Sequence, residues 1–448
     1  MAKHDKDPIE KTEGDDLFRS LINYADVFLA VSGGADSTAL MHLVAGWRAS
    51  RSDGPRVAVL TVDHGLRPEA AREAQAVAAQ AAELGLPATV LTWHGDKPVS
   101  GVQAAARDAR YGLMFAHVRE AAADPRRAAL VTAHHRDDLA ETFLMRLARG
   151  AGVDGLASIL PVTRREDISI LRPLLNVPKS RLLASLAVFG SSWVEDPSNA
   201  DPHFERSRLR TSLPAARQLG LDGAHLALSA RRLARARRAL EAQVDTWLTP
   251  RLTSPLLSAA GVFVWPWRQE ALADEIAIRI LLRVLPAVGG VAEPVRLMRA
   301  ERLWDDMQRD DFAGATLANC IVSPAEQAGV MIFREPRRAT LPTIETDLGR
   351  PLSWDNRFEI AIRCGQIAGC RVRPLTSQDL ALFNVDTSSR ALPCPLEALL
   401  ATPVIDDPAG PCAIPALNLH RRGPNAPANR LSCRFMTERF ETRVGGSV

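Results

Sequence analysis

The most distinctive chemistry of this chain lies in a glycine loop near its N-terminus. The loop consists of Ser32, Gly33, Gly34, Ala35, Asp36 and Ser37. It follows an apolar run at 27–31 and precedes apolar residues at helical spacing, so it joins a predicted strand to a predicted helix. Such a junction directs unpaired N–H groups and the positive end of the helix dipole at one point. Glycines let the backbone approach phosphate oxygens. The loop therefore predicts a phosphate site, although the lysine of a Walker A sequence is missing.

A second reactive cluster, residues 132–142, combines two histidines with three acids, Asp137, Asp138 and Glu141. It follows another predicted strand and enters a helix, on which Asp137 and Glu141 share a face. The residues themselves leave two ligands open, Mg²⁺ held with nucleotide phosphates and an ammonium group. Zinc suits the cluster less well, because His134 and His135 are adjacent and no cysteine is near. A simpler alternative is that the acids only cap the helix.

Two further positions follow the same logic. Asp63 and His64 come directly after a predicted strand, where the Asp63 carboxylate is placed to bond a ribose or adenine group. Arg107 and Arg110 are three apart on a predicted helix and can pair with phosphate from one face. A helix cap and a solvated helix face are the structural alternatives.

Two later segments are rich in arginine. Arg206 and Arg210 are four apart on a predicted helix, with Arg208 turned elsewhere. A second helix carries Arg231, Arg232, Arg235, Arg237 and Arg238. Either helix can contact a nucleic-acid backbone, since arginines on phosphate position a partner without reading its sequence. Exposed helix faces offer the simpler explanation.

Composition favours a cytoplasmic enzyme. The six cysteines all lie beyond residue 319 and form no C-x-x-C pair, which argues against a disulfide framework. No apolar run is long enough to span a membrane. The polar segment 1–16 is expected to be a disordered tail rather than an export signal. The net charge of +3 permits an acidic partner without requiring one.

The order of the predicted elements indicates an α/β fold. Predicted strands at 26–31, 57–62, 88–92, 129–133 and 168–172 alternate with helices at 37–49, 68–85, 101–121 and 136–149. This alternation predicts a parallel, twisted sheet with helices on both faces, and ligands beyond the carboxyl ends of its strands.

The rest of the chain predicts two further domains. Residues 17–215 would form the catalytic domain, 216–340 a mainly helical domain, and 341–448 a small α+β domain. Pro214 and residues 249–266 are expected to interrupt the helices. Later strands are predicted at 316–322, 330–334, 358–363 and 369–373.

Together these motifs resemble the bacterial tRNA(Ile)-lysidine synthetases of the PP-loop ATP pyrophosphatase superfamily. The matching segments are SGGADS (32–37), VDHGLR (62–67), VQAAAR (102–107), TAHHRDD (132–138), LRPLL (171–175) and WVEDPSN (193–199). Ser207 departs from the asparagine usual in the family, and the C-terminal half matches only loosely.

The resemblance implies a Rossmann-like fold and a two-step reaction. ATP would adenylate C2 of the wobble cytidine in an isoleucine tRNA with a CAU anticodon, and free L-lysine would then displace AMP. Asp36 would anchor Mg²⁺, with Ser32 and Ser37 on phosphate and Arg110 among the catalytic residues. Asp137 is the expected proton acceptor, supported by Asp138 and Glu141. A homodimer is expected from the family rather than from any feature of the sequence.

Rival functions fit the residues less well. A tRNA thiolase typically uses cysteines, and residues 1–319 contain none. A GMP or NAD synthetase would need a supply of ammonia, and the cluster at 132–138 fits lysidine formation better. A non-catalytic tRNA-binding protein would not need the intact Ser32, Asp36 and Ser37.

Overall fold

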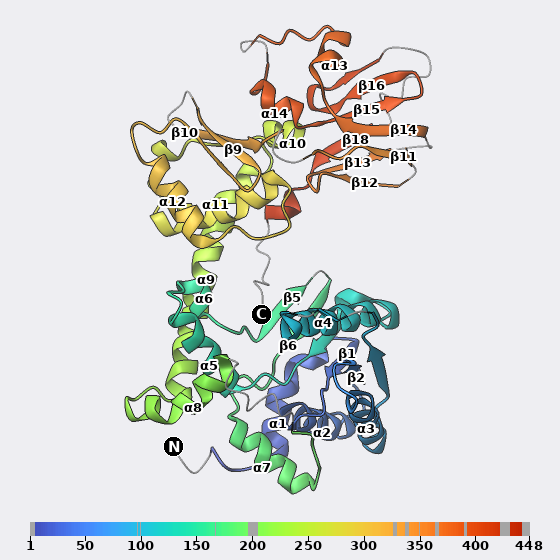
Figure 1. Ribbon diagram of the computed structural model, residues 1–448, viewed down its shortest axis with the longest axis vertical. Helices are drawn as coiled ribbons and strands as arrows, with labels where there is room; N and C mark the ends of the chain where they lie inside the picture. The colour runs from blue at the N-terminus through green and yellow to red at the C-terminus, as the bar shows by residue number, and fades with distance from the viewer. Residues whose placement is uncertain are drawn as a thin grey trace. The chain divides into compact units, whose positions relative to one another are not determined.

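The computed structural model of the chain is shown as a ribbon in Figure 1. It describes residues 5–95, 97–98, 100–165, 167–195, 205–325, 329–336, 340–348, 350–362, 367–388, 392–421 and 431–440. Of the predicted motif at 193–199, the positions after 195 lie outside these described residues.

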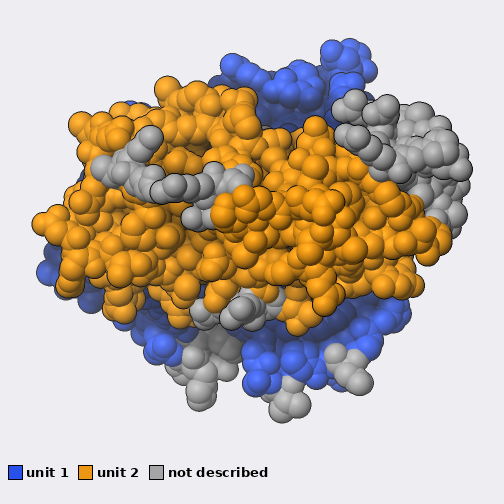
Figure 2. All heavy atoms as spheres, turned by 90° about the horizontal axis from the view of Figure 1, so that it is seen from above, with its two compact units in different colours: residues 1–238, 443–448 blue, residues 239–442 orange. Residues whose placement is uncertain are grey.

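The chain divides into two compact units (Figure 2). The division falls between Arg238 and Ala239, inside the long helix α9 (Gly223–Leu248). The sequence predicts boundaries after residues 215 and 340 instead. The finer division into three domains and their roles therefore stays a prediction.

A six-stranded sheet forms the centre of the first unit, in the order β3-β2-β1-β4-β6-β5. Its strands are β1 (Asp26–Ala30), β2 (Arg56–Asp63), β3 (Ala88–Thr92), β4 (Ala128–Val131), β5 (Val162–Arg165) and β6 (Ile168–Leu171). All neighbours pair in parallel except β5, which runs antiparallel to β6 at the edge. The predicted parallel sheet is thus confirmed, with β5 as an added edge strand.

Helices cover both faces of this sheet (Figure 1). Successive strand residues point to opposite faces, so Val27 and Leu29 pack on one side and Phe28 on the other. The first side carries α1 (Lys11–Phe18), α2 (Ala35–Ala49), α3 (Ala70–Glu83) and α7 (Lys179–Phe189). The second carries α4 (Val102–Ala121), through Met114, Phe115 and Val118. This arrangement confirms the predicted layers.

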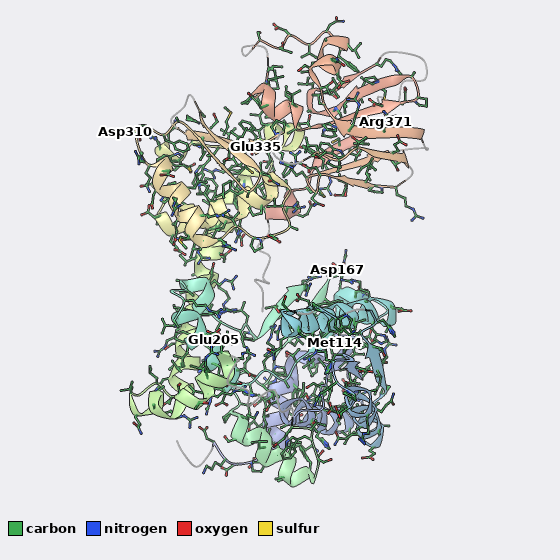
Figure 3. The ribbon with its side chains drawn as sticks, in the orientation of Figure 1. Met114, Asp167, Glu205, Asp310, Glu335 and Arg371 are labelled. Carbon is green, nitrogen blue, oxygen red and sulfur yellow. The ribbon has the colours of Figure 1, made fainter. Side chains whose placement is uncertain are left out.

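Three further helices extend from the sheet beside α9. They are α5 (Arg136–Leu147), α6 (Val153–Leu156) and α8 (Glu205–Gln218). Leu139 and Phe143 of α5 pack against Leu226 and Ala230 of α9 in a small apolar core. Glu205, labelled in Figure 3, begins α8 and pairs with Arg149.

Two local predictions about the first unit need correction. Helix α8 continues through Pro214, so this proline does not end a helix. The segment expected as a disordered tail contains α1 from Lys11 onward and a buried Ile9. Two of its acids form ion pairs with other parts of the unit: Asp5 with Arg136 and Glu13 with Arg181.

The second unit combines helices with antiparallel sheets. Its helices are α10 (Pro255–Ala260), α11 (Asp274–Gly289), α12 (Leu297–Met307), α13 (Ser377–Leu382) and α14 (Leu396–Leu400). One sheet has the order β7-β10-β9-β8, from Phe263–Trp265, Gly329–Arg334, Cys320–Ala325 and Ala315–Leu317. The break predicted within 249–266 is confirmed by the short α10 and β7.

Two more sheets follow in the second unit. The strands of the first lie side by side in the order β11 (Ile344–Leu348), β14 (Ile367–Pro374), β15 (Pro403–Asp407), β16 (Gly410–Ile414) and β17 (Leu419–His420). The strands of the other lie in the order β12 (Leu352–Trp354), β13 (Phe358–Ile362) and β18 (Leu431–Phe435). The strands predicted at 330–334 and 369–373 are confirmed by β10 and β14, and β13 confirms the described part of 358–363. The strand predicted at 316–322 is wrong as a single strand, because a turn at 318–319 divides it into β8 and β9. A single apolar core joins Leu285 and Val322 to Phe358 and Ile405, across the predicted boundary at 340.

Across the described ranges of both units, we find no helix with the length and apolar character needed to cross a membrane.

Candidate active site

The candidate site lies where the sheet order reverses. The connections from β1 lead outward to β2 and β3, and the chain then returns through α4 to β4 on the other side of β1. The carboxyl ends of β1 and β4 therefore flank a crevice, the usual ligand position in open parallel sheets. A cavity of about 360 Å³ opens there, with Met114 of α4 in its wall (labelled in Figure 3).

Seven of the predicted site residues line this cavity. They are Ser32, Gly34, Asp36, His64, Arg110, Asp138 and Arg206. The fold thus brings together the glycine loop, the end of β2, helix α4, the acid cluster and α8. Among the described residues that line it, sequence reasoning missed Thr61, Arg67, Glu73 and Tyr111. Arg67 stands within the predicted motif at 62–67, three positions after His64, and could have been singled out there.

Gly33 gives the loop its shape. Its φ of +82° lies in the region that favours glycine, and a Cβ there would come within 3.2 Å of Val77 Cγ2. Its carbonyl accepts a hydrogen bond from the Val194 amide over 2.9 Å. The loop is thereby held between α3 and the segment after α7, and this backbone requires glycine.

Two serine hydroxyls organise the same loop from within. Ser37 Oγ accepts a hydrogen bond from the Ser32 amide over 3.1 Å and donates to the Gly34 carbonyl over 2.9 Å. Ser32 Oγ lies 3.3 Å from Ser37 Oγ. Ser37 is buried and does not face the cavity, whereas Ser32 lines it. Ser32 is therefore the better candidate for a phosphate contact, and Ser37 preorganises the loop.

Asp36 carries the loop's only charge and lies between His135 and Lys179. Its Oδ2 is 3.4 Å from His135 Nε2 and 3.4 Å from Lys179 Nζ. Burial would raise the pKa of Asp36, but His135 and Lys179 outweigh it and hold the pKa below its usual value. Asp36 is therefore ionised at neutral pH.

The residues present fit a magnesium ion at Asp36. Its Oδ1 is buried and has no hydrogen-bond partner within the described ranges, so this oxygen can accept a cation. Those ranges contain no group of three or more histidine, cysteine, aspartate or glutamate ligands. Mg²⁺ needs no such cage, since it binds through one or two carboxylates together with substrate phosphates and water.

His135 connects the acid cluster to the loop. It caps α5, because its Nδ1 accepts the Asp138 amide over 3.4 Å and its own amide donates to Asp138 Oδ2 over 3.1 Å. This bond assigns the proton to Nε2, which faces Asp36. Burial would lower the pKa of His135, but the neighbouring carboxylates outweigh it and raise the pKa above its ordinary value.

His134 has the opposite character. Its Nδ1 lies 2.8 Å from Thr132 Oγ1, and both residues line the cavity. Burial lowers the pKa of His134 to about 4, against the opposing effect of Asp138. The imidazole is therefore neutral at physiological pH and presents a hydrogen-bonding group to the cavity.

The three acids of the cluster have three different environments. Asp138 lines the cavity. Asp137 does not line it, and its Oδ2 accepts the backbone N–H of Lys179 over 2.8 Å at the start of α7. Glu141 is almost fully buried and accepts two hydrogen bonds from Arg210. Geometry therefore favours Asp138 over Asp137, the residue that the sequence predicts as the proton acceptor.

The end of β2 contributes His64 but not Asp63. Burial lowers the pKa of His64, and the nearby Arg110 and Arg67 lower it further. Asp63 Oδ1 accepts the Gly65 amide over 3.0 Å in a tight turn, outside the lining residues. The predicted contact of Asp63 with ribose or adenine stays a prediction.

Arginines give the cavity a positive wall. Arg67, Arg107, Arg110 and Arg206 all line it, and Arg67 pairs with Glu73 over 2.8 Å. Several guanidinium groups around one cavity suit a polyphosphate, which they can bind in a planar, two-pronged manner. Arg208 and Arg210 do not line the cavity.

The arginines of α9 lie apart from this cavity. Arg231 Nη1 donates to Asn176 Oδ1 over 2.7 Å and lines a second, mostly apolar cavity of about 290 Å³. Arg235 is exposed, while Arg237 pairs with Asp154 over 3.1 Å. The structure thus separates these arginines into exposed and structurally paired members.

Comparison with known proteins identifies the family. Residues 9–216 match the PP-loop domain family. A tRNA(Ile)-lysidine synthase from Bradyrhizobium sp. is 42% identical over 350 residues, which cover 74% of this chain and 96% of the relative. The synthase of Methylobacterium nodulans is 47% identical and covers 61% of this chain and 79% of its own. That of Wolbachia pipientis is 31% identical and covers 93% and 95%. The chain therefore belongs to the tRNA(Ile)-lysidine synthase family.

Proposed function

We propose that this protein is a ligase that converts the wobble cytidine of a CAU-anticodon isoleucine tRNA to lysidine. The reaction consumes ATP and free L-lysine and releases AMP and pyrophosphate. One observation carries the proposal: the glycine loop and the cluster of His134 and Asp138 line the same cavity at the switch point of the sheet. A candidate phosphate site and a candidate proton acceptor for an amine therefore lie in the same cavity.

In the first step, the C2 oxygen of the cytidine attacks the α-phosphorus of ATP. A phosphorus–oxygen bond to the nucleoside forms, and the bond to pyrophosphate breaks. The loop amides around Gly34 and the hydroxyl of Ser32 hold the departing pyrophosphate. Arg107 and Arg110 neutralise the charge on the phosphates. Positioning and charge neutralisation supply most of the rate in phosphoryl chemistry.

Asp36 would hold Mg²⁺ through its Oδ1, which has no hydrogen-bond partner in the described part of the chain. The ion, when bound, would neutralise phosphate charge and polarise the α-phosphoryl group. The remaining contributions come from the protein, which keeps Asp36 ionised through His135 and Lys179.

In the second step, the side-chain amine of lysine attacks C2 and AMP leaves with the former C2 oxygen. The amine must lose its proton, because its ordinary pKa is about 10.4. We assign the proton acceptor to Asp138, which lines the cavity, with the neutral His134 as a hydrogen-bond partner of the incoming amine. Asp137 and Glu141 support the cluster from behind through their bonds to Lys179 and Arg210.

The tRNA contacts are proposed for the two arginine-rich helices and for the second unit. Arg206 lines the cavity and is the arginine best placed for a phosphate next to the reacting base. Arg208, Arg231 and Arg235 would extend this surface. Arg210 would contribute its charge while it stays paired with Glu141. Such contacts position the tRNA, whereas the anticodon bases would be recognised by stacking and edge hydrogen bonds.

One assay pair tests the proposal. The protein should catalyse ATP–pyrophosphate exchange only when the isoleucine tRNA is present. After incubation with ATP and lysine, mass spectrometry of the tRNA should show the wobble cytidine increased by one lysine residue. Exchange without a mass change would indicate a different acceptor, and the absence of both would contradict the proposal.

A further inference from the structure

Lys179 contacts the predicted magnesium ligand Asp36, and its part in metal binding is not covered by the two-step mechanism. Its Nζ lies 3.4 Å from Asp36 Oδ2. Its backbone N–H donates to Asp137 Oδ2 over 2.8 Å, so the acid cluster holds the residue in place. Two acids from separate elements thus fix one lysine, its main chain to α5 and its side chain to the glycine loop.

The position of Lys179 opposes the usual electrostatics of a helix. It is the first residue of α7, and a positive charge there lies at the positive end of the helix dipole. The other basic residue of the first turn, Arg181, pairs with Glu13, a contact that ties α1 to α7. The partner of Lys179 is instead the carboxylate of the phosphate loop. A charge placed against the dipole and directed at the loop indicates a role beyond stabilising α7.

We propose that Lys179 is a positioning residue whose ammonium group occupies the Asp36 carboxylate in the free protein and competes there with the divalent cation. The inference rests on the proposed function, since it takes Asp36 as the magnesium ligand. The Lys179 ammonium group holds the Asp36 carboxylate in place before the nucleotide arrives. When the metal–nucleotide complex binds, the ammonium group gives up Asp36 to the metal.

The geometry permits this exchange. The Lys179 side chain is 41% exposed, so its four-carbon stem can swing away without disrupting the core. The backbone bond to Asp137 keeps the residue at the loop when the side chain moves. The buried Oδ1 of Asp36 stays available to the metal, while the shared Oδ2 is the atom for which the two cations compete.

In the experiment, the 448-residue chain is titrated with Mn²⁺ in the absence of nucleotide and tRNA. Electron paramagnetic resonance measures the bound and free Mn²⁺ at each step. Removing the positive charge 3.4 Å from Asp36 Oδ2 should tighten Mn²⁺ binding by about tenfold in Lys179→Met. Lys179→Arg keeps the charge and should bind Mn²⁺ as the wild type does. Lys11→Met, at an exposed lysine on α1, controls for the general loss of one charge.

The outcomes separate the inference from the proposed function. If Lys179→Met binds Mn²⁺ no more tightly than the wild type or the Lys11→Met control, the inference is wrong. The Asp36→Asn change should abolish the tight site in the Lys179→Met background. If it does not, the metal is not held by Asp36, and the magnesium assignment fails as well. Thermal melting of each variant identifies unfolded protein, and the Lys179→Arg result distinguishes lost charge from lost packing.

Discussion

The guanidinium of Arg210 forms a two-pronged ion pair with the carboxylate of Glu141. Nε lies 2.7 Å from Oε1 and Nη2 lies 3.2 Å from Oε2. The Glu141 side chain is only 3% exposed, and this pair joins α8 to α5. Arg210, a predicted tRNA contact, therefore already compensates a buried acid in the protein alone, which makes stability the first property that its replacement affects.

Arg210→Met should lower the free energy of unfolding by about 1–3 kcal/mol, because it leaves a buried carboxylate without its partner. Urea denaturation followed by circular dichroism measures the change. Glu141→Gln in the Arg210→Met background removes the uncompensated charge and should restore part of the loss. Strictly additive effects of the two substitutions would show that the pair contributes nothing to stability.

Asp138→Asn and Asp137→Asn should affect different properties. Asp138 lines the cavity, so its amide variant should slow lysine transfer by about 100-fold or more, as expected for loss of a general base. Asp137→Asn weakens the cap on α7 and should lower the unfolding free energy by about 1 kcal/mol. Single-turnover transfer of lysine to adenylated tRNA and thermal melting measure the two properties.

The comparison of these two variants decides between the sequence-based and the structural assignment. If Asp137→Asn abolishes transfer while Asp138→Asn leaves it intact, Asp137 is the proton acceptor, as the sequence predicts. tRNA-dependent ATP–pyrophosphate exchange serves as the control, since neither variant removes the glycine loop.

The sequence predicted local features of this site well and long-range contacts poorly. The apolar run of β1 and the glycines after it are local properties, so the strand, loop and helix follow from residues a few positions apart. The contact of Asp36 with Lys179 spans 143 positions, and that of Glu141 with Arg210 spans 69. No sequence periodicity or residue spacing predicts a contact between residues so far apart in the chain. Adjacent acids also look alike in a sequence, whereas the direction of each side chain at the start of α5 separates Asp137 from Asp138.

Gly33→Ala and Gly34→Ala form a matched pair that tests the shape of the loop. Alanine at Gly33 must adopt a φ of +82° and approach Val77 Cγ2 at 3.2 Å, so it should destabilise the protein by about 1–2 kcal/mol. Gly34 has a φ of −72°, and a Cβ there meets nothing closer than Ser32 Oγ at 3.7 Å. Its alanine variant should keep the wild-type melting temperature. Equal destabilisation of both variants would contradict this account of the loop.

His134 and His135 should give stability opposite dependences on pH. The pKa of His134 is lowered to about 4, so its contribution is complete above pH 6.5 and is lost as the pH falls toward 4. The loss reaches about 3 kcal/mol at most. The pKa of His135 is raised, so its contribution is complete below 6.5 and is lost as the pH rises through the folded-state value.

Urea denaturation at a series of pH values measures both effects. His134→Gln should flatten the rise in stability between pH 4 and 6.5, and His135→Gln should remove the fall above 6.5. Each variant serves as the control for the other. Profiles that stay parallel to the wild type in both variants would show that neither imidazole titrates as its surroundings predict.

Arg235 and Arg237 lie two positions apart on α9 and should contribute differently to tRNA binding. Arg235 is exposed, whereas Arg237 is paired with Asp154 over 3.1 Å. An arginine that neutralises a phosphate releases a counterion, so Arg235→Met should weaken binding and reduce the slope of log affinity against log salt by about 1. Arg237→Met should leave the slope unchanged, because its charge is already compensated within the protein.

Filter binding of the isoleucine tRNA between about 50 and 200 mM salt measures both slopes. If the slopes of the wild type and Arg235→Met are equal, this face of α9 does not contact the tRNA. If only Arg237→Met reduces the slope, its ion pair with Asp154 opens when tRNA binds.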